Sequence, residues 1–183
     1  MNVIYVTGND HKAKYFSKMV GIEIAHQKAD VDEIQSLDAE EIITKKAKQA
    51  YELLKKPVII EDTFLVFDSM GRLPGTFVKW FIDEVGLEAM CNLAIGKNGS
   101  SGATAGAAIA YYDGKNMQVF KSSLRGTIAK TLRGESGFGW NRIFIPDGSN
   151  STLGEMSDKD FMLYYDQIKP FKAIRNFLDN LEA

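Results

Sequence analysis

The beginning of the chain constrains the fold most, because an apolar run passes directly into a turn and then into a helical pattern. Residues 2–6 read as a buried strand, since Val3 to Val6 are all apolar or aromatic. A Gly-Asn turn follows, and residues 10–20 carry apolar side chains at helical spacing until Gly21. A strand that leads at once into a helix is typical of α/β folds.

Residues 22–25 alternate as a short strand, and a second buried strand is expected after a long helical pattern over about residues 38–54. Acids crowd the first turn of that pattern and lysines its later turns, as the helix dipole favours. Pro57 ends the helix, and residues 58–60 are β-branched and apolar. We expect this strand to deliver Glu61 and Asp62 to its C-terminal end; whether a strand resumes over residues 64–67 is left open.

The later part of the chain has a β-rich pattern. Residues 108–112 and 117–126 flank Asp113-Gly114, and Asp-Gly between such runs indicates a hairpin. A short strand over residues 143–145 and a final helix starting near Pro170 complete the pattern. We therefore expect a mixed α/β domain whose sheet is flanked by helices, with two lobes and a cleft between them.

Length and composition limit the class of protein. A chain of 183 residues suffices for one domain with a substantial core, so we expect a single domain over residues 1–183. The net charge is −2, which gives no broad basic face for nucleic acid. Cys91 is the single cysteine and cannot form an internal disulfide, and no apolar run approaches the roughly 20 residues of a membrane span. We expect a cytoplasmic protein that binds neither nucleic acid nor membrane.

The turn after the first strand has the features of an anion site. Backbone N–H groups at a helix start point outward and bind phosphates. Lys12 adds a positive charge, and Thr7 or Asn9 can donate hydrogen bonds. The segment lacks the spacing of a Walker A loop. The alternative is an ordinary turn with a solvated lysine.

Carboxylates supply the second chemical signal. Glu61 and Asp62 have no cation next to them in sequence, so burying them is unfavourable unless a metal or ligand neutralises them. Oxygen ligands of this kind suit Mg²⁺, which takes its remaining ligands from water and phosphates. Glu33 in an acidic loop and Lys46 on the long helix are further candidates. The alternatives are a capping role for Asp62 and solvated surface positions for the other two.

A glycine-rich segment, residues 137–141, combines flexible backbone with aromatic side chains. Phe138 and Trp140 can stack on a nucleotide base, and Asn141 can read its edge. A packed turn is the alternative interpretation.

Taken together and in order, these segments resemble the inosine triphosphate pyrophosphatase family, which hydrolyses non-standard purine nucleoside triphosphates. Each match is weak alone, but the collinear set is specific. The matching residues are Thr7, Gly8, Asn9, Lys12, Glu33, Lys46, Ala47, Glu61, Asp62, Thr63, Leu65, Leu73, Pro74, Gly75, Lys79, Trp80, Phe81, Phe138, Gly139, Trp140, Phe144, Pro146, Asp147, Gly148, Thr152, Glu155 and Met156.

The resemblance implies an α/β fold with a long central sheet, a deep nucleotide cleft and a homodimer. It also implies Mg²⁺-dependent cleavage between the α and β phosphates, which yields a nucleoside monophosphate and pyrophosphate. Asp62 and Lys12 would be catalytic, Asp62 by orienting or deprotonating the attacking water. Glu33 and Asp62 would hold Mg²⁺, directly or through water, with Glu61 close by. The residues that would hold the triphosphate are Thr7, Gly8, Asn9, Asp10, His11, Lys12, Lys46 and Thr63. Those that would surround the base are Phe138, Gly139, Trp140, Asn141 and Lys159.

The residues that would surround the nucleotide base depart from the pattern of the family. Asn141 stands where the family has an aspartate, and the family's lysine and Ser-His-Arg triplet are missing. Counting without gaps from Glu155 places Phe161 at the lysine and residues 165–167 (Tyr-Asp-Gln) at the triplet. Lys159 is the nearest candidate for the lysine. A hydrogen-bonding site loses discrimination when its donors disappear.

The departure leaves three functions open. The first is hydrolysis of ITP, dITP or XTP in nucleotide-pool cleansing. The second is a paralogue with changed base specificity, such as one for modified pyrimidine nucleotides. The third is a non-catalytic nucleotide-binding module. Whether Tyr164, Tyr165 or Gln167 lines the base site is also open, although we expect one tyrosine of the pair to pack in the core.

Overall fold

The computed structural model describes residues 2–182, except for the side chains of His11 and Glu182. The chain divides into two compact units. The first unit comprises Met1–Asp62, Ala107–Ser122 and Lys169–Ala183, and the second comprises Thr63–Gly106 and Ser123–Ile168. Because three strands contribute residues to both units, the units are not consecutive in sequence.

In residues 2–182, seven strands form a mixed sheet in the order β2-β1-β3-β5-β6-β7, with β4 paired to β3. Strand β1 is parallel to both β2 and β3, whereas β4 and β7 pair antiparallel with β3 and β6. The strands are β1 (Ile4–Val6), β2 (Ala25–Gln27), β3 (Val58–Phe67), β4 (Pro74–Gly75), β5 (Gly102–Tyr112), β6 (Met117–Ile128) and β7 (Phe144–Pro146).

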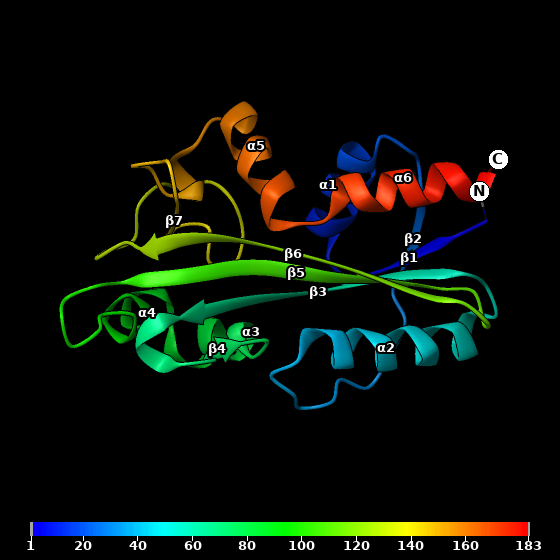
Figure 1. Ribbon diagram of the computed structural model, residues 1–183, viewed down its shortest axis with the longest axis horizontal. Helices are drawn as coiled ribbons and strands as arrows, with labels where there is room; N and C mark the ends of the chain where they lie inside the picture. The colour runs from blue at the N-terminus through cyan, green and yellow to red at the C-terminus, as the bar shows by residue number, and fades with distance from the viewer. Residues whose placement is uncertain (1, 183) are drawn as a thin grey trace. The chain divides into compact units, whose positions relative to one another are not determined.

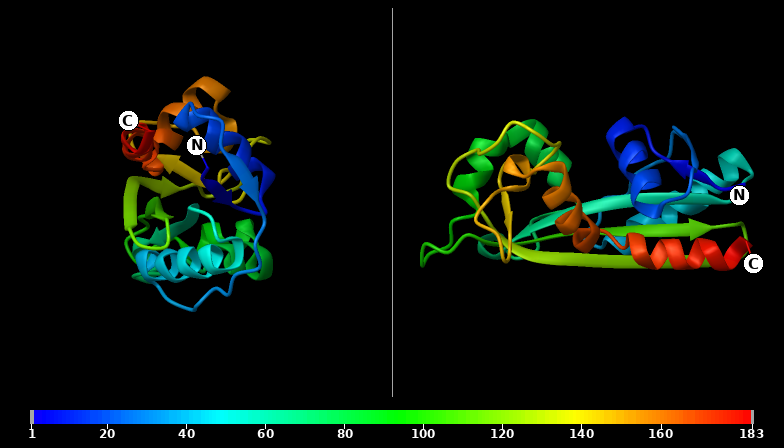
Figure 2. Two further views of the ribbon diagram at one scale, coloured as in Figure 1. Left: turned by 90° about the vertical axis from the view of Figure 1, so that its right-hand side faces the viewer. Right: turned by 90° about the horizontal axis from the view of Figure 1, so that it is seen from above.

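Helices cover both faces of the strands within each unit. In the first unit, α1 and α6 lie on one face and α2 lies on the other (Figure 1). In the second unit, α5 lies on one side of the strands and α3 and α4 on the opposite side (Figure 2). The helices are α1 (Asp10–Val20), α2 (Ala39–Leu54), α3 (Val78–Trp80), α4 (Leu87–Leu93), α5 (Asp158–Ile168) and α6 (Phe171–Glu182). Short turns of other helix types are η1 (Asp68–Met70), η2 (Phe81–Val85) and η3 (Leu153–Glu155).

The core of the first unit joins its two sequence ends. Tyr5 on β1 stacks on Phe16 of α1 with ring centroids 4.1 Å apart, and Phe16 meets the edge of Phe171 on α6 at 6.0 Å. All three rings are at most 1% exposed. Burial of such rings contributes roughly 1.5–3 kcal/mol each, so α6 is fixed to α1 by apolar contact.

Helix α2 begins and ends through identifiable caps. The backbone N–H of Glu40 donates to the Asp38 carboxylate at 2.9 Å, which stabilises the helix by about 1 kcal/mol. Lys55 closes the other end in the left-handed region at φ 52°. One face of α2 buries a stripe of small and β-branched residues: Ala39, Ile42, Ile43, Ala47 and Ala50.

Most expected elements are confirmed. Helix α1 spans residues 10–20 as predicted, and β5 and β6 are neighbours joined across Asp113-Gly114. The strand expected at residues 22–25 instead lies at Ala25–Gln27, where all three residues are exposed. Helix α5 was not predicted. Among the described residues, no helix is both long and apolar enough to cross a membrane.

Candidate active site

Glu61 and Asp62 lie inside strand β3, not at its end, so the predicted end of this strand was wrong. Strand β3 continues to Phe67 because Leu65 and Phe67 resume the buried apolar pattern. Glu61 is 6% exposed and Asp62 is 9% exposed. Buried carboxylates in the middle of a strand need compensating charge or a ligand.

The pairing of β1 with β3 brings the first turn of the chain to these acids. Val6 pairs with Ile60 in parallel register, so the chain leaves β1 beside Glu61. The backbone N–H of Thr7 still bonds to the Gln27 carbonyl at 3.1 Å. The expected juxtaposition of this turn and the acids therefore follows from strand register.

Two lysines hold Glu61. The Lys169 ammonium lies 2.7 Å from Glu61 Oε1, and the Lys12 ammonium lies 3.2 Å from the same oxygen. Burial alone would raise the pKa of Glu61, but the two lysines outweigh burial and lower it to about 2. Glu61 is therefore a carboxylate at any physiological pH.

Lys169 was missed by the sequence interpretation. Its side chain is 3% exposed, and burial lowers its pKa to about 8 although Glu61 opposes the shift. The available signal was a lysine between Ile168 and Pro170, in an apolar context directly before the last helix. A lysine in such a setting is rarely buried without a carboxylate partner.

Asp62 differs from Glu61 because no lysine is bonded to it. Burial raises the pKa of Asp62 to about 6; Lys46 and Lys12 oppose this shift, and Glu33 and Glu61 add to it. Its Oδ2 atom is buried and has no hydrogen-bond partner among the described residues. A carboxylate oxygen in this state can accept a proton, a water hydrogen or a metal ion.

The turn after β1 is ordered by its own side chains. The Asn9 carboxamide oxygen accepts from the Lys12 backbone N–H at 3.2 Å and so caps α1. The Asn9 backbone N–H donates to the Thr7 hydroxyl at 3.1 Å. Gly8, Asn9 and Asp10 are exposed, while the side chain of His11 lies outside the described residues. The start of α1 is thus exposed to solvent, as an anion site requires.

Gly8 lies close to a neighbour that was not predicted. A Cβ at Gly8 would lie 3.3 Å from the Lys28 side chain, which follows β2 and is exposed. Lys28 therefore adds a third positive charge near the turn, after Lys12 and the helix dipole.

Glu33 and Lys46 form an ion pair of 2.8 Å in the first unit. Lys46 is only 12% exposed and Glu33 is 50% exposed, so the pair lies between core and solvent. The loop that carries Glu33 is held by the Asp32 backbone N–H, which donates to Gln49 on α2 at 2.8 Å. Lys46 therefore does not have the solvated surface position of the alternative interpretation, whereas Glu33 is exposed and is held by its ion pair with Lys46.

We call six charged residues of the first unit the acid–lysine cluster; its members are Lys12, Glu33, Lys46, Glu61, Asp62 and Lys169. Within the described residues, no group of three or more His, Cys, Asp or Glu side chains is preassembled to hold a metal ion. A metal here would need oxygens from water or phosphates, which is the usual coordination of Mg²⁺. The partnerless oxygen of Asp62 and the half-exposed carboxylate of Glu33 fit that requirement.

The aromatic loop, residues 137–141, belongs to the second unit. Trp140 is 8% exposed and meets Phe144 edge-on at 5.5 Å, whereas Phe138 is half-buried with its ring 6.3 Å from Tyr165. Gly139 is exposed, with φ +59°. Phe138 is thus the aromatic side chain of the loop with more accessible surface.

Asn141 is buried and serves the loop itself. With its amide assigned by hydrogen bonding, Asn141 donates to the Phe138 carbonyl at 3.3 Å and accepts from the Phe138 N–H at 3.2 Å. Gly137 stays small because a Cβ there would lie 2.5 Å from this amide. A packed turn is therefore present, and reading of a base edge by Asn141 stays a prediction.

The segment that a gapless count places at the family triplet lies in helix α5. Tyr165 is 3% exposed and stacks on Phe161 at 4.9 Å, which confirms that one tyrosine of the pair packs in the core. Tyr164 is half-buried, and Lys159 is exposed in the first turn of α5. A base contact from Lys159 stays a prediction, as does the phosphate contact of Thr63, which is half-buried in β3.

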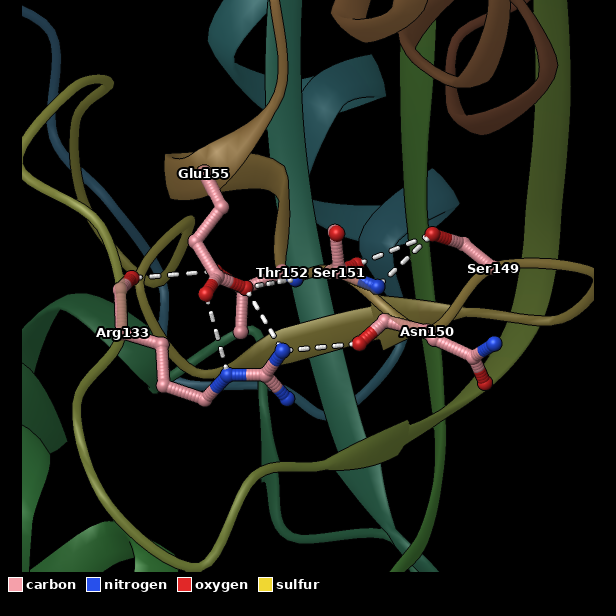
Figure 3. Close-up of polar contacts among 6 residues, drawn as sticks. All are labelled: Arg133, Ser149, Asn150, Ser151, Thr152 and Glu155. Atoms are coloured by element: carbon pink, nitrogen blue, oxygen red, sulfur yellow. Dashed lines mark hydrogen bonds and ion pairs between the residues drawn. The ribbon is translucent and has the colours of Figure 1, made fainter.

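Two matching residues of the second unit have structural partners, as Figure 3 shows. Thr152 and Glu155 form a capping box, in which the Thr152 N–H donates to Glu155 at 2.8 Å. The Thr152 hydroxyl donates to the Arg133 carbonyl at 2.9 Å, and the Arg133 guanidinium pairs with Glu155 at 2.9 Å. This set of bonds holds the turn that follows β7.

The chain is similar over nearly its whole length to proteins of known families. A protein-family model described as "Ham1 family" matches residues 3–176, and the chain belongs to this family. It is 37% identical to an inosine triphosphate pyrophosphatase of Yarrowia lipolytica, over 97% of this chain and 96% of that protein. It is 32% identical to a dITP/XTP pyrophosphatase of Saccharolobus solfataricus, over 96% and 92% of the two chains.

Solved structures support the same fold. The Ham1 protein of Staphylococcus aureus matches with a TM-score of 0.81 at 22% identity, over 98% of this chain and 99% of that one. A HAM1 protein from Coxiella burnetii matches with a TM-score of 0.78 at 20% identity. The expected mixed α/β fold, with a central sheet flanked by helices, is confirmed.

Proposed function

We propose that this protein hydrolyses non-standard purine nucleoside triphosphates, such as ITP, dITP and XTP, to the monophosphate and pyrophosphate. The observation that carries the proposal is Asp62, a buried carboxylate with a raised pKa and a partnerless oxygen, between lysines of the same unit. The names of the relatives give the substrate class. Such a reaction would remove damaged nucleotides from the precursor pool.

The roles follow from charge and position. The N–H groups at the start of α1, with Lys12 and Lys46, would bind the triphosphate and reduce the repulsion that it exerts on an attacking water. Asp62 would orient this water and accept its proton as the bond between the α and β phosphates breaks. A pKa of about 6 leaves Asp62 ionised near neutral pH yet basic enough to take the proton.

The proposal includes Mg²⁺. Glu33 and Asp62 would hold the ion, directly or through water, with Glu61 close by. When bound, it would neutralise phosphate charge and polarise the bond that breaks. Glu61 is a weaker candidate for a metal ligand than expected, because two lysines already pair with its Oε1 atom. Its Oε2 atom has no hydrogen-bond partner among the described residues.

The aromatic loop would supply the base contacts. Phe138 has accessible ring surface for stacking, Trp140 is buried against Phe144, and Gly139 between them in sequence is exposed. A second candidate is a changed base preference, favoured by one observation: buried Tyr165 stands where a gapless count places the family triplet.

The exposed side chains of Trp80, at 65%, and Leu93, at 40%, supply apolar surface for the expected homodimer. A cytoplasmic location, where nucleotide pools lie, belongs to the same proposal.

Product analysis with ITP tests the proposal. The protein should release IMP and pyrophosphate in equal amounts with Mg²⁺, and neither with excess EDTA. Asp62→Asn, shown to be folded by circular dichroism, should release neither. Release of IDP and phosphate by the wild type would contradict the assigned bond, and absence of any product from a folded, nucleotide-binding protein would favour the non-catalytic module.

A further inference from the structure

Glu61 has more counter-charge than it needs. Two ammonium groups approach its Oε1 atom, Lys169 at 2.7 Å and Lys12 at 3.2 Å. Glu61 itself has a 2% exposed side chain. A buried carboxylate is costly without a cation, but one well-placed lysine neutralises it. The second lysine is therefore in excess as far as Glu61 is concerned.

The two lysines are not equivalent. The Lys169 side chain is 3% exposed, and that of Lys12 is 20% exposed. Lys12 stands in the first turn of α1, next to the uncovered backbone of Gly8 and Asn9. Lys12 can therefore reach an anion that arrives from solvent, whereas Lys169 is enclosed.

The position of Lys169 is fixed by packing. The Phe171 backbone N–H donates to the Lys169 carbonyl at 2.9 Å, and the Phe171 ring meets Phe16 of α1 edge-on. The ammonium also lies 5.9 Å from the centre of the Phe171 ring. The docking of α6 on α1 thus holds Lys169 against Glu61.

We propose that Lys169 is a positioning residue, a permanent counter-ion of Glu61 that allows Lys12 to be transferred to the phosphates of the substrate. The inference rests on the proposed function, because it names what Lys12 binds. When a polyphosphate draws Lys12 away, Glu61 keeps Lys169 and is not left as an unpaired buried charge. Without Lys169, phosphate and Glu61 would compete for Lys12.

Binding of inorganic pyrophosphate, measured by calorimetry in EDTA, tests this without metal or turnover. Lys169→Met should weaken binding roughly 10- to 100-fold, the range expected for coupled charges. Lys169→Arg should bind nearly as the wild type does. The pair Glu61→Gln with Lys169→Met should regain most of the affinity, because Lys12 no longer has a competing partner. Lys172→Met, which changes an exposed lysine on α6 three residues further along the chain, is the matched control and should change nothing.

Steady-state kinetics with Mg²⁺ and ITP give a second measurement. Lys169→Met should raise KM more than it lowers kcat, since its effect passes through Lys12.

Unchanged pyrophosphate affinity in folded Lys169→Met, or no recovery in the double variant, would overturn the inference. If Lys169→Met does not fold, the comparison of Glu61→Gln with the double variant decides: equal affinities support the transfer, and weaker binding by the double variant contradicts it. Failure of the wild type to hydrolyse ITP would refute the proposed function but leave the pyrophosphate result interpretable.

Discussion

Buried polar groups are hydrogen-bonded differently in the acid–lysine cluster of the first unit and in the aromatic loop of the second unit. In the loop, Asn141 bonds to the Phe138 backbone, and nearby Thr152 bonds to Glu155 and Arg133. In the cluster, Asp62 keeps a buried oxygen with no partner among the described residues, and its pKa is raised.

The difference indicates which region is organised for chemistry. Polar groups that satisfy one another rigidify a structure and need no ligand. A buried carboxylate without a partner destabilises the fold, and such sites persist where function requires them. We therefore propose that the cluster carries the reaction and that the loop supplies shape and stacking.

The largest expected effect is that of Asp62→Asn. Loss of the proton acceptor should lower kcat roughly 10²- to 10⁴-fold. The variant should also be more stable than the wild type near neutral pH, because burial no longer opposes a charge. Turnover and urea denaturation measured on the same preparation check both parts. A variant that is inactive but less stable would show that Asp62 has a structural role, and the contrast between the two regions would fail.

The pH dependence of stability follows from the carboxyl group of Asp62. Its ordinary pKa of 3.8 is raised to about 6 in the folded protein. Between these values the unfolded chain loses the proton first, so the raised pKa makes folding less favourable as pH increases. The stability advantage of Asp62→Asn should grow from near zero at pH 4 to about 3 kcal/mol at pH 7. Denaturation in metal-free buffer at several pH values measures this; a constant difference would contradict the raised pKa.

Loss of Lys46 should have a smaller effect on activity than loss of Asp62. Lys46→Met removes a cation that pairs with Glu33 and acts on Asp62, so KM for ITP should rise roughly tenfold, in the range of one charge-assisted bond. Lys48→Met, two residues along the same helix and exposed, is the control. Equal effects of the two variants would mean that only net charge matters.

The aromatic loop should show the smallest effect on kcat, and its effect on nucleotide binding should be separable from binding of the phosphates. Phe138→Ala removes the accessible ring, and a lost base stack is worth about 1–3 kcal/mol. KM should rise for every nucleotide, whereas binding of inorganic pyrophosphate should not change. Weaker pyrophosphate binding by folded Phe138→Ala would show that the loop also contributes to the phosphate site.

Local patterns predicted much of the fold and about half of the charge arrangement. The turn at Gly8-Asn9, the helix expected over about residues 38–54 and the hairpin at Asp113-Gly114 depend on neighbours in sequence. The Lys169–Glu61 pair could not be predicted in this way, because 108 residues separate the partners. The length of β3 was underestimated because two acids interrupt its apolar pattern, and only the distant lysine makes them tolerable inside a strand.

The most direct test is pyrophosphate release by the wild type with Mg²⁺, across ITP, dITP, XTP, the standard nucleotides and modified pyrimidine triphosphates. We predict release from all substrates that bind, with the highest kcat/KM for ITP, dITP or XTP. A preference for a modified pyrimidine would keep the role of the cluster and reassign the base specificity. Absence of pyrophosphate from every substrate would contradict the account.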